Sequence, residues 1–502
     1  MLLALTGVLS AAAQAADLES SLRHLLRTND LGRTAVAVCV ADLDKGSVLA
    51  AIGAEKPMIP ASNMKLLTTA AALNILDDDF EFRTELALIK PVDGKDAMLI
   101  VRSDGDPAFG DPILLKQHGL TVDGLLDQWV HAVRRTQLQR FDRLIIDDRI
   151  FDRQRVHETW PARQLHKKSF AEVAGINFHL NCLGVMLEPA LLAGAAPKIL
   201  LSPASPFVVM SNLMKTGKTD TFSIDRKPGT NDLIFRGTLR TRPSHPWQVT
   251  VHDPPLYFAR ILSSRLRSKG IEVHAIERIA AGTNLPPNQI LHSVRTVLPL
   301  VLTRTNRNSQ NLFAEALLKR IGHEVTGAPG SWGNGSAAIH RFLQQHLGAR
   351  ASEAVIADGS GLSRENRVSA KMLVALLRSM HETPAYRELY RDSLAYAGRT
   401  YDGQYHSTGT FKRGRRFDGL PAGRWVFGKS GFINQVSALS GYFFVPIDNW
   451  DRSSGKHLRT IAFSFIFNGF TPPKYNRDMK RLQEKMIEMI DASITISADR
   501  GV

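Results

Sequence analysis

The stretch PMIPASNMKLLTTAAALNIL, residues 57–76, carries one charge, that of Lys65, in a run of otherwise apolar or neutral residues that favours a buried helix. Residues three apart share one face of a helix, so Ser62 and Lys65 can touch. Pro60 and Ala61 place the serine at the helix N-terminus, where free N–H groups favour a developing anion. An apolar setting lowers the pKa of a lysine, which can then take the proton of a serine. The stretch predicts a nucleophile and its base within one turn.

The Ser-x-x-Lys spacing alone also fits a capping serine followed by a lysine that reaches solvent. The same spacing occurs at Ser453 and Lys456, in a polar loop where no helix would align the two side chains. Ser62 and Lys65 therefore need support from other parts of the chain.

Two later stretches supply that support. Ser309 and Asn311 form Ser-x-Asn at the start of a helical pattern, and Lys429, Ser430 and Gly431 open a pair of strand patterns. Taken alone, the first is a helix cap and the second a turn. The order Ser-x-x-Lys, Ser-x-Asn, Lys-Ser/Thr-Gly is the motif set of the penicilloyl serine transferases.

Two further matches compete with the third motif. Lys215-Thr216-Gly217 precedes the Ser-x-Asn motif and has polar flanks, so Lys429 is preferred. Residues 423–430, GRWVFGKS, fit the phosphate-binding loop pattern letter for letter. Their interior is bulky and β-forming, and the residues after them are strand-like where a phosphate loop needs a helix. We therefore expect no nucleotide, and the histidine spacings predict no metal site. Serine and lysine chemistry needs no other cofactor.

The length and charge of the chain limit the number of domains and the kinds of partner that we expect. A chain of 502 residues predicts two or more domains. The net charge of +15 is spread over short basic runs, so we favour a solvated basic surface over nucleic-acid binding. Cys39 lies in a buried strand pattern and is best explained as a packed free thiol, although a disulfide with Cys182 stays open.

The first residues resemble a secretory signal peptide. An apolar run ends in Ala13-Gln14-Ala15, a small-x-small cleavage pattern, so we predict a signal peptide at residues 1–16 and a location in the periplasm. The alternative is a first buried helix. No later segment has the roughly 18 to 20 continuous apolar residues of a membrane span.

Four stretches resemble one family: PASNMKLLTTAAAL, NSQNLFAEALL, DGSGLSRENRVSA and GKSGFINQVSALSGYFF. They look like the D-alanyl-D-alanine carboxypeptidase/endopeptidase family, peptidase family S13, whose members with a large insertion are often called penicillin-binding protein 4. The long gap between Ser62 and Ser309 is typical of that class. The resemblance covers roughly residues 30–485.

The resemblance implies an α/β (α+β) fold: a penicillin-binding transpeptidase or serine β-lactamase-like catalytic domain interrupted by two smaller, β-rich domains. The patterns agree, because strands and helices at both ends of the chain flank a β-like middle punctuated by Pro and Gly. The expected parts are a signal peptide (1–16), the catalytic domain (17–88 and 286–502), inserted domain II (89–165 and 250–285) and inserted domain III (166–249).

The resemblance also implies catalytic roles. Ser62 would attack the carbonyl between two D-alanines, Lys65 would take its proton, and Ser309 would relay a proton to the leaving amine. The backbone N–H groups of Ser62 and Phe432 would form the oxyanion hole, where one donor is worth ~2.7–4 kcal/mol.

Substrate-binding roles follow in the same way. Asn311 would bond the substrate amide, Lys429 and Ser430 would hold the terminal carboxylate, and Gly431 would leave room for the substrate along the strand. Ser430 replaces the commoner threonine, and the bulky GFINQV that follows leaves the substrate preference open.

The expected activity is therefore that of an exported serine D,D-peptidase that cleaves peptidoglycan stem peptides through an acyl-enzyme and is inhibited by β-lactams. A β-lactamase or esterase of the same fold and a non-catalytic wall-binding protein remain the alternatives. Peripheral association with the membrane or wall stays open. Asp147 or Asp148 could contact a cationic stem side chain or simply end a strand in a salt bridge. Residues 358–363, DGSGLS, resemble a family signature near the cleft, and they either have a catalytic role or form a tight turn.

Overall fold

The computed structural model describes residues 17–90, 96–446 and 458–499. The predicted signal peptide and the second Ser-x-x-Lys, at Ser453 and Lys456, lie outside these residues. The chain divides into two compact units: unit 1 is Met1–Asp78, Leu302–Gln310 and Ser336–Val502, and unit 2 is Asp79–Val301 and Asn311–Gly335.

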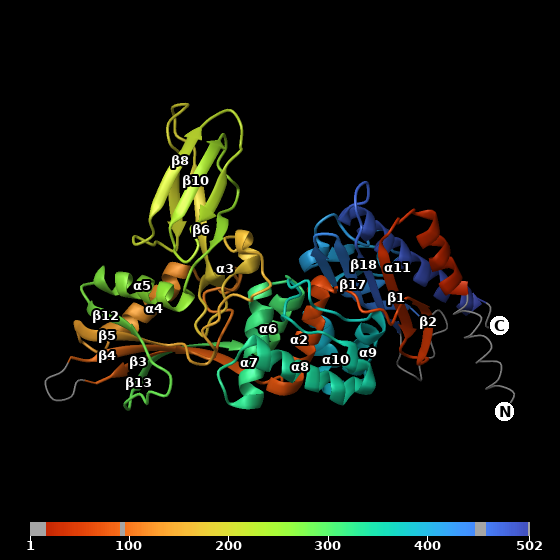
Figure 1. The fold of residues 1–502 in the computed structure, drawn as a ribbon, viewed down its shortest axis with the longest axis horizontal. Helices are drawn as coiled ribbons and strands as arrows, with labels where there is room; N and C mark the ends of the chain where they lie inside the picture. Colours follow the sequence, from red (N-terminus) through yellow and green to blue (C-terminus); the bar gives the residue numbers. More distant parts are fainter. Residues whose placement is uncertain (1–16, 91–95, 447–457, 500–502) are drawn as a thin grey trace. The chain divides into compact units, whose positions relative to one another are not determined.

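Unit 1 is built on a seven-stranded antiparallel sheet in the order β15-β14-β16-β17-β18-β1-β2 (Figure 1). Its strands are β1 (Ala35–Asp42), β2 (Ser47–Ile52), β14 (Ala395–Arg399), β15 (Tyr405–Ser407), β16 (Trp425–Ile433), β17 (Val436–Pro446) and β18 (Leu458–Asn468).

Helices cover both faces of this sheet, which explains why its central strands read as continuous apolar runs. β17 and β18 are buried along almost their whole length. Helix α11 (Asn476–Asp499) packs against β17, and α9 (Ala370–Glu382) contacts β18 and β1 from the other side (Figure 1). A helix over residues 17–28 adds Leu18 and Leu22 to the core on the α11 side.

The predicted buried helix is present in unit 1. A 3₁₀ turn, η1 (Ala61–Asn63), leads into α2 (Met64–Leu76), whose residues are buried on nearly all sides. The other helices that contribute to unit 1 are α6 (Leu298–Asn306), α8 (Trp332–Leu347) and α10 (Pro384–Ser393), and the first turns of α6 and α8 begin in unit 2.

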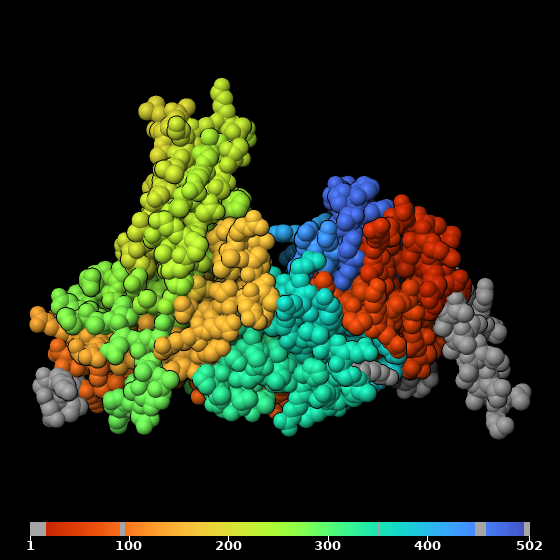
Figure 2. All heavy atoms as spheres, in the orientation of Figure 1, coloured from red at the N-terminus to blue at the C-terminus, as the bar shows by residue number. Residues whose placement is uncertain are grey.

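Unit 2 holds three sheets. A mixed sheet has the order β12-β5-β4-β3-β13, and two three-stranded sheets have the orders β8-β10-β9 and β11-β6-β7. The strands are β3 (Glu81–Ile89), β4 (Met98–Ser103), β5 (Arg140–Asp147), β6 (Cys182–Glu188), β7 (Lys198–Ser202), β8 (Met210–Thr216), β9 (Ser223–Arg226), β10 (Leu233–Leu239), β11 (Trp247–Thr250), β12 (Glu272–Arg278) and β13 (Gln289–Val297). The three-stranded sheets project from the five-stranded one (Figures 1 and 2).

Strand alternation decides which face of the five-stranded sheet is covered. Leu86, Val101 and Ile146 point to a core shared with α4 (Val122–Arg134) and α5 (Pro254–Arg267). The intervening residues Glu85 and Arg102 point the opposite way. Unit 2 also contains the short helix α3 (Pro112–Gln117) and the longer helix α7 (Asn311–Thr326).

The mixed α/β class with several sheets is as predicted. The division into a catalytic domain and two insertions stays a prediction, and the pairing of β3 with β13 bears on its boundaries. These strands lie within or beside segments expected in the catalytic domain, yet they join the five-stranded sheet of unit 2. Alternation shows that a segment is a strand, but it does not name the partner about two hundred residues away.

Cys39 on β1 and Cys182 on β6 are both free and buried, which answers the question of a disulfide between them. Burial raises the pKa of the Cys39 thiol to about 11 and that of Cys182 to about 12. Both thiols are therefore neutral packing groups. In the described part of the chain, we find no helix whose length and apolarity would let it span a bilayer.

Candidate active site

Ser62 and Lys65 meet as their spacing predicts. Lys65 is fully buried on α2, and its Nζ donates to Ser62 Oγ at 3.1 Å. Ser62 lies in the 3₁₀ turn before the helix and is half-buried, so its hydroxyl remains reachable. Ala61 beside it has φ +46°, a left-handed conformation that non-glycine residues adopt mainly where the surrounding structure imposes it.

The loop at residues 358–363 supplies a second contact to Lys65. The Lys65 amine donates to the carbonyl of Ser360 at 2.7 Å. Asp358 fixes this loop because its carboxylate accepts from the N–H of Gly361 at 2.8 Å and from that of Ser363 at 2.6 Å. The segment is thus a tight turn that holds a carbonyl against Lys65. The sequence did not reveal this contact because it uses a backbone atom.

Lys429 joins the second and third motifs. It is buried on β16, and its Nζ donates to Ser309 Oγ at 2.8 Å and to the Ser430 carbonyl at 2.8 Å. Burial, and next the charge of Lys65, lower the pKa of Lys429 well below 10.5. The two amines therefore lie within electrostatic reach of each other. Ser309 has φ +55° in the break between α6 and α7.

The first and third motifs pack directly on each other. A Cβ at Gly431 would lie 2.9 Å from the Pro60 carbonyl oxygen and 3.1 Å from the Ser62 nitrogen. Gly431 therefore lets β16 approach the turn that carries the serine, a reason that the sequence did not suggest. Asn63 reinforces the contact: in the orientation that satisfies both ends of its amide, it donates to the Lys429 carbonyl at 2.7 Å.

The remaining predicted residues differ in how closely they join this cluster. Ser430 Oγ donates to Thr410 Oγ1 at 3.0 Å, and the Phe432 side chain is 54% exposed at the far end of the same strand. Asn311 opens α7 in unit 2, where its amide donates to the Ser169 carbonyl at 2.9 Å. Its approach to Ser62 stays a prediction.

The competing motifs are accounted for by their surroundings. Lys215 is exposed on β8 in unit 2. The phosphate-loop interpretation of residues 423–430 is wrong, because most of them belong to β16 and the next element is the strand β17. Asp147 pairs with Arg149 at 2.7 Å and Asp148 with Arg278 at 3.1 Å, which supports the salt-bridge explanation of both.

The fold and this serine–lysine cluster agree with one class of enzyme, the active-site serine peptidases that bind penicillin. Residues 18–492 match the model of the D-Ala-D-Ala carboxypeptidase 3 (S13) family, and the chain belongs to that family. The protein is thus a serine-type D-alanyl-D-alanine carboxypeptidase, as the resemblance predicted.

Two similar proteins, one of them with two solved structures, illustrate the relationship. The D-alanyl-D-alanine carboxypeptidase of Actinomadura sp. (strain R39) is 29% identical over 479 residues, which are 92% of this chain and 82% of the relative. The crystal structure of penicillin binding protein 4 (dacB) from Haemophilus influenzae has a TM-score of 0.74 at 21% identity and covers 94% of this chain and 99% of its own. The same protein complexed with a novel β-lactam has a TM-score of 0.69 at 20% identity with the same coverage. These structures confirm the predicted fold.

Proposed function

We propose that this chain is an exported D,D-peptidase that cleaves D-alanyl bonds of peptidoglycan stem peptides through an acyl-enzyme on Ser62. One observation carries the assignment: the buried Lys65 amine lies 3.1 Å from Ser62 Oγ.

Acylation begins when the Lys65 amine, in its unprotonated form, takes the Ser62 hydroxyl proton. The Ser360 carbonyl accepts one N–H of that amine at 2.7 Å, which helps to hold Nζ beside the Ser62 hydroxyl. The Oγ then attacks the carbonyl carbon of the penultimate D-alanine. The N–H groups of Ser62 and Phe432 are the proposed donors to the oxyanion, each worth ~2.7–4 kcal/mol.

The second step breaks the C–N bond. The tetrahedral intermediate collapses, the carbonyl reforms as an ester to Ser62, and the leaving amine needs one proton. Ser309 can deliver it, because its hydroxyl is hydrogen-bonded to the Lys429 amine at 2.8 Å. The proton that Lys65 took from Ser62 replaces the one that Ser309 gives up, so Lys65 becomes a neutral amine again and Lys429 keeps its charge.

Lys429 also provides the cation for the substrate's terminal carboxylate, together with the Ser430 hydroxyl. Among the described residues, the two hydrogen-bond partners of the Lys429 amine, Ser309 Oγ and the Ser430 carbonyl, are neutral. An arriving carboxylate would therefore be the counter-ion that stabilises its charged form. Asn311 is the proposed donor or acceptor for the substrate amide.

Deacylation requires one water. Its oxygen attacks the ester carbon while the neutral Lys65 amine takes one of its protons. Lys65 then returns that proton to Ser62 Oγ as the ester C–O bond breaks and the acid leaves. When the leaving amine is free D-alanine the reaction is a carboxypeptidase reaction, and when the amine belongs to a second stem it is an endopeptidase reaction. The same residues serve both.

Inhibition and location follow from the same proposal. The β-lactam complex of the structural relative supports acylation of Ser62 by β-lactams. Export rests on the predicted signal peptide at residues 1–16 and on the peptidoglycan substrate of the proposed reaction, and a net charge of +15 suits association with an anionic wall.

Digestion of purified muropeptides tests the proposal. Wild-type protein should release D-alanine from pentapeptide monomers or split cross-linked dimers, and Ser62→Ala should do neither. Lys215→Ala is the matched control for Lys429→Ala, because Lys215 has the same Lys-Thr-Gly-like context but is exposed on β8. Full activity of Ser62→Ala would refute the assignment of the nucleophile.

A further inference from the structure

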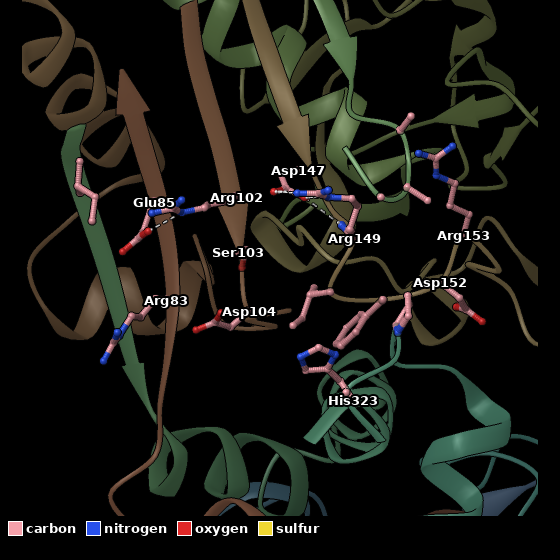
Figure 3. A pocket seen from close by; sticks show the side chains of 18 residues that line it. Arg83, Glu85, Arg102, Ser103, Asp104, Asp147, Arg149, Asp152, Arg153 and His323 are labelled. Carbon is pink, nitrogen blue, oxygen red and sulfur yellow. Dashed lines mark hydrogen bonds and ion pairs between the residues drawn. The ribbon is translucent and has the colours of Figure 1, made fainter. Parts of the chain in front are cut away.

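Unit 2 contains a cavity of about 1010 Å³ on the face of its five-stranded sheet that α4 and α5 leave uncovered (Figure 3). Strands β4, β5 and β12 run parallel, and the cavity lies where they end, at Ser103, Asp147 and the loop 280–282. Ligands commonly bind outside the carboxyl ends of parallel strands. All residues that line the cavity belong to unit 2.

One wall is a row of alternating charges across three strands. Glu85 on β3, Arg102 on β4 and Asp147 on β5 are cross-strand neighbours. Arg102 Nε donates to Glu85 at 2.8 Å, and Arg149 donates two hydrogen bonds to Asp147 at 2.7 and 2.8 Å (Figure 3). These pairs neutralise one another and hold the side chains of this wall in place.

Three other charged side chains that line the cavity are not neutralised by such ion pairs. Within the described ranges, Arg83, Arg153 and Asp104 form no ion pair inside 4 Å. Arg83 and Arg153 are exposed, and one N–H of Arg153 donates to the Ile279 carbonyl at 3.0 Å. Asp104 is half-buried; burial raises its pKa, and the charges of Arg320 and Arg83 oppose that rise. Two cations and one carboxylate thus face a concave surface.

The side chains that a ligand would meet are separated along this surface. In Figure 3, Arg83, Asp104 and His323 lie below the charged row and Arg153 lies at its far end. A single small anion could bind one guanidinium, but it would leave the Asp104 carboxylate without a cation from the ligand. A chain with several charged groups matches the pattern better, because a guanidinium binds carboxylate through paired N–H donors and Asp104 can accept from an ammonium.

We propose that this cavity binds a short peptide that carries more carboxylates than amines, with carboxylates on Arg83 and Arg153 and an amine on Asp104. The choice of a peptide rests on the proposed function, because peptidoglycan stem peptides carry such charges. The protein would then hold a second piece of wall polymer in unit 2, at a site that uses no residue of the Ser62 cluster.

Calorimetric titration tests the site. The probe is L-alanyl-γ-D-glutamate, which has two carboxylates and one amine and lacks a D-alanyl end. It is added to full-length protein already acylated with benzylpenicillin and, in parallel, to Ser62→Ala. Saturable binding is expected in both, and Arg83→Gln combined with Arg153→Gln should weaken it at least tenfold, through loss of charge-assisted hydrogen bonds. Circular dichroism melts check that each variant is folded.

Control variants and control ligands show which groups of the dipeptide the cavity recognises. Arg236→Gln removes an exposed arginine of another sheet, paired with Asp225 at 3.3 Å, and should leave binding unchanged. Asp104→Asn should weaken the free dipeptide several-fold but not its N-acetyl form. Inorganic phosphate and D-alanine should bind at least tenfold more weakly than the dipeptide.

Absence of saturable heat in the wild type, or equal affinity in the Arg83/Arg153 variant and Arg236→Gln, would overturn the proposal. Equal affinity for phosphate would overturn the peptide class and leave a simple anion site. Failure of the proposed function shows separately, as a lack of penicillin adduct on Ser62, and the Ser62→Ala titration still reports on the cavity.

Discussion

Two regions of the molecule bury lysines, and their partners differ. In unit 2, Lys319 on α7 is fully buried, donates to Asp152 at 2.5 Å and to the Gln154 carbonyl at 2.6 Å, and lies 3.9 Å from the centre of the Trp332 ring. In unit 1, Lys429 contacts a hydroxyl and a carbonyl. The carboxylate of Asp152 and the ring of Trp332 stabilise Lys319 in its charged form. The hydroxyl beside Lys429 is a group with which the amine can exchange a proton.

The comparison shows that burial alone does not make a lysine catalytic. Burial lowers the pKa of both Lys319 and Lys429, but Asp152 raises that of Lys319 again, while the next contribution at Lys429 is the like charge of Lys65, which lowers it further. The groups that surround a buried lysine, more than its degree of burial, decide whether it is a structural cation or a group that can give up its proton.

The largest expected effect is that of Lys65→Met. Without an amine at 3.1 Å, the Ser62 hydroxyl keeps its proton, and acylation by benzylpenicillin should slow by about a thousandfold, within the range of general-base catalysis. Stopped-flow or gel-based labelling with a fluorescent penicillin measures the rate. A Lys65→Met rate within tenfold of wild type would show that another group is the base.

Lys429→Met should have the next largest effect. Loss of the cation and of the bond to Ser309 should lower the acylation rate by about a hundredfold, most strongly for β-lactams with a free carboxylate. Comparison with a carboxylate-esterified β-lactam provides the control, because the ester should lose less. Equal losses for both compounds would contradict a role in carboxylate binding.

Lys319→Met tests the structural role assigned to the buried lysine of unit 2. The substitution leaves Asp152 without its Lys319 partner and removes the contact with Trp332. The free energy of unfolding should therefore fall by about 1–3 kcal/mol. Acylation per folded molecule should stay the same. Urea unfolding followed by labelling below the transition measures both quantities. A stable variant that cannot be acylated would reverse the roles assigned to the two regions.

The smallest expected effect is in the pH dependence of stability. The native pKa of Lys429 lies below its usual value of 10.5, so the unfolded chain binds more protons between these two values. This contribution to stability is complete above pH 10.5 and is lost as the pH falls through the lowered native pKa. Wild-type stability should therefore rise with pH across this window relative to Lys429→Met. Parallel curves for the two proteins would indicate that Lys429 has an ordinary pKa in the folded state.

The sequence predicted those features that depend on side-chain type and spacing. Ser62 and Lys65 are three apart on a buried helix start, and the motif order indicated that Ser309 and Lys429 belong with them; the structure joins the latter two at 2.8 Å. The contact of Lys65 with the Ser360 carbonyl could not be predicted in this way, because any residue type offers that atom. An Asp followed by Gly-x-Gly and Ser signals a turn, but not what the turn touches.

Features that depend on strand pairing were also beyond the sequence. The pairing of β3 with β13 joins segments about two hundred residues apart, and the row from Glu85 to Asp147 exists only once β3, β4 and β5 are in register. The packing reason for Gly431 likewise appears only when β16 lies against the turn at Ser62. Periodicity fixes which way a residue points along one strand and leaves its neighbours on the next strand open.

The central claim is that Ser62, activated by Lys65, is the residue that becomes acylated. Intact mass spectrometry of the protein after incubation with benzylpenicillin, followed by peptide mapping, tests it directly. We expect a gain of one penicilloyl group on the peptide that contains Ser62 and no gain in Ser62→Ala. An adduct on another residue, or an unmodified wild-type protein, would contradict it.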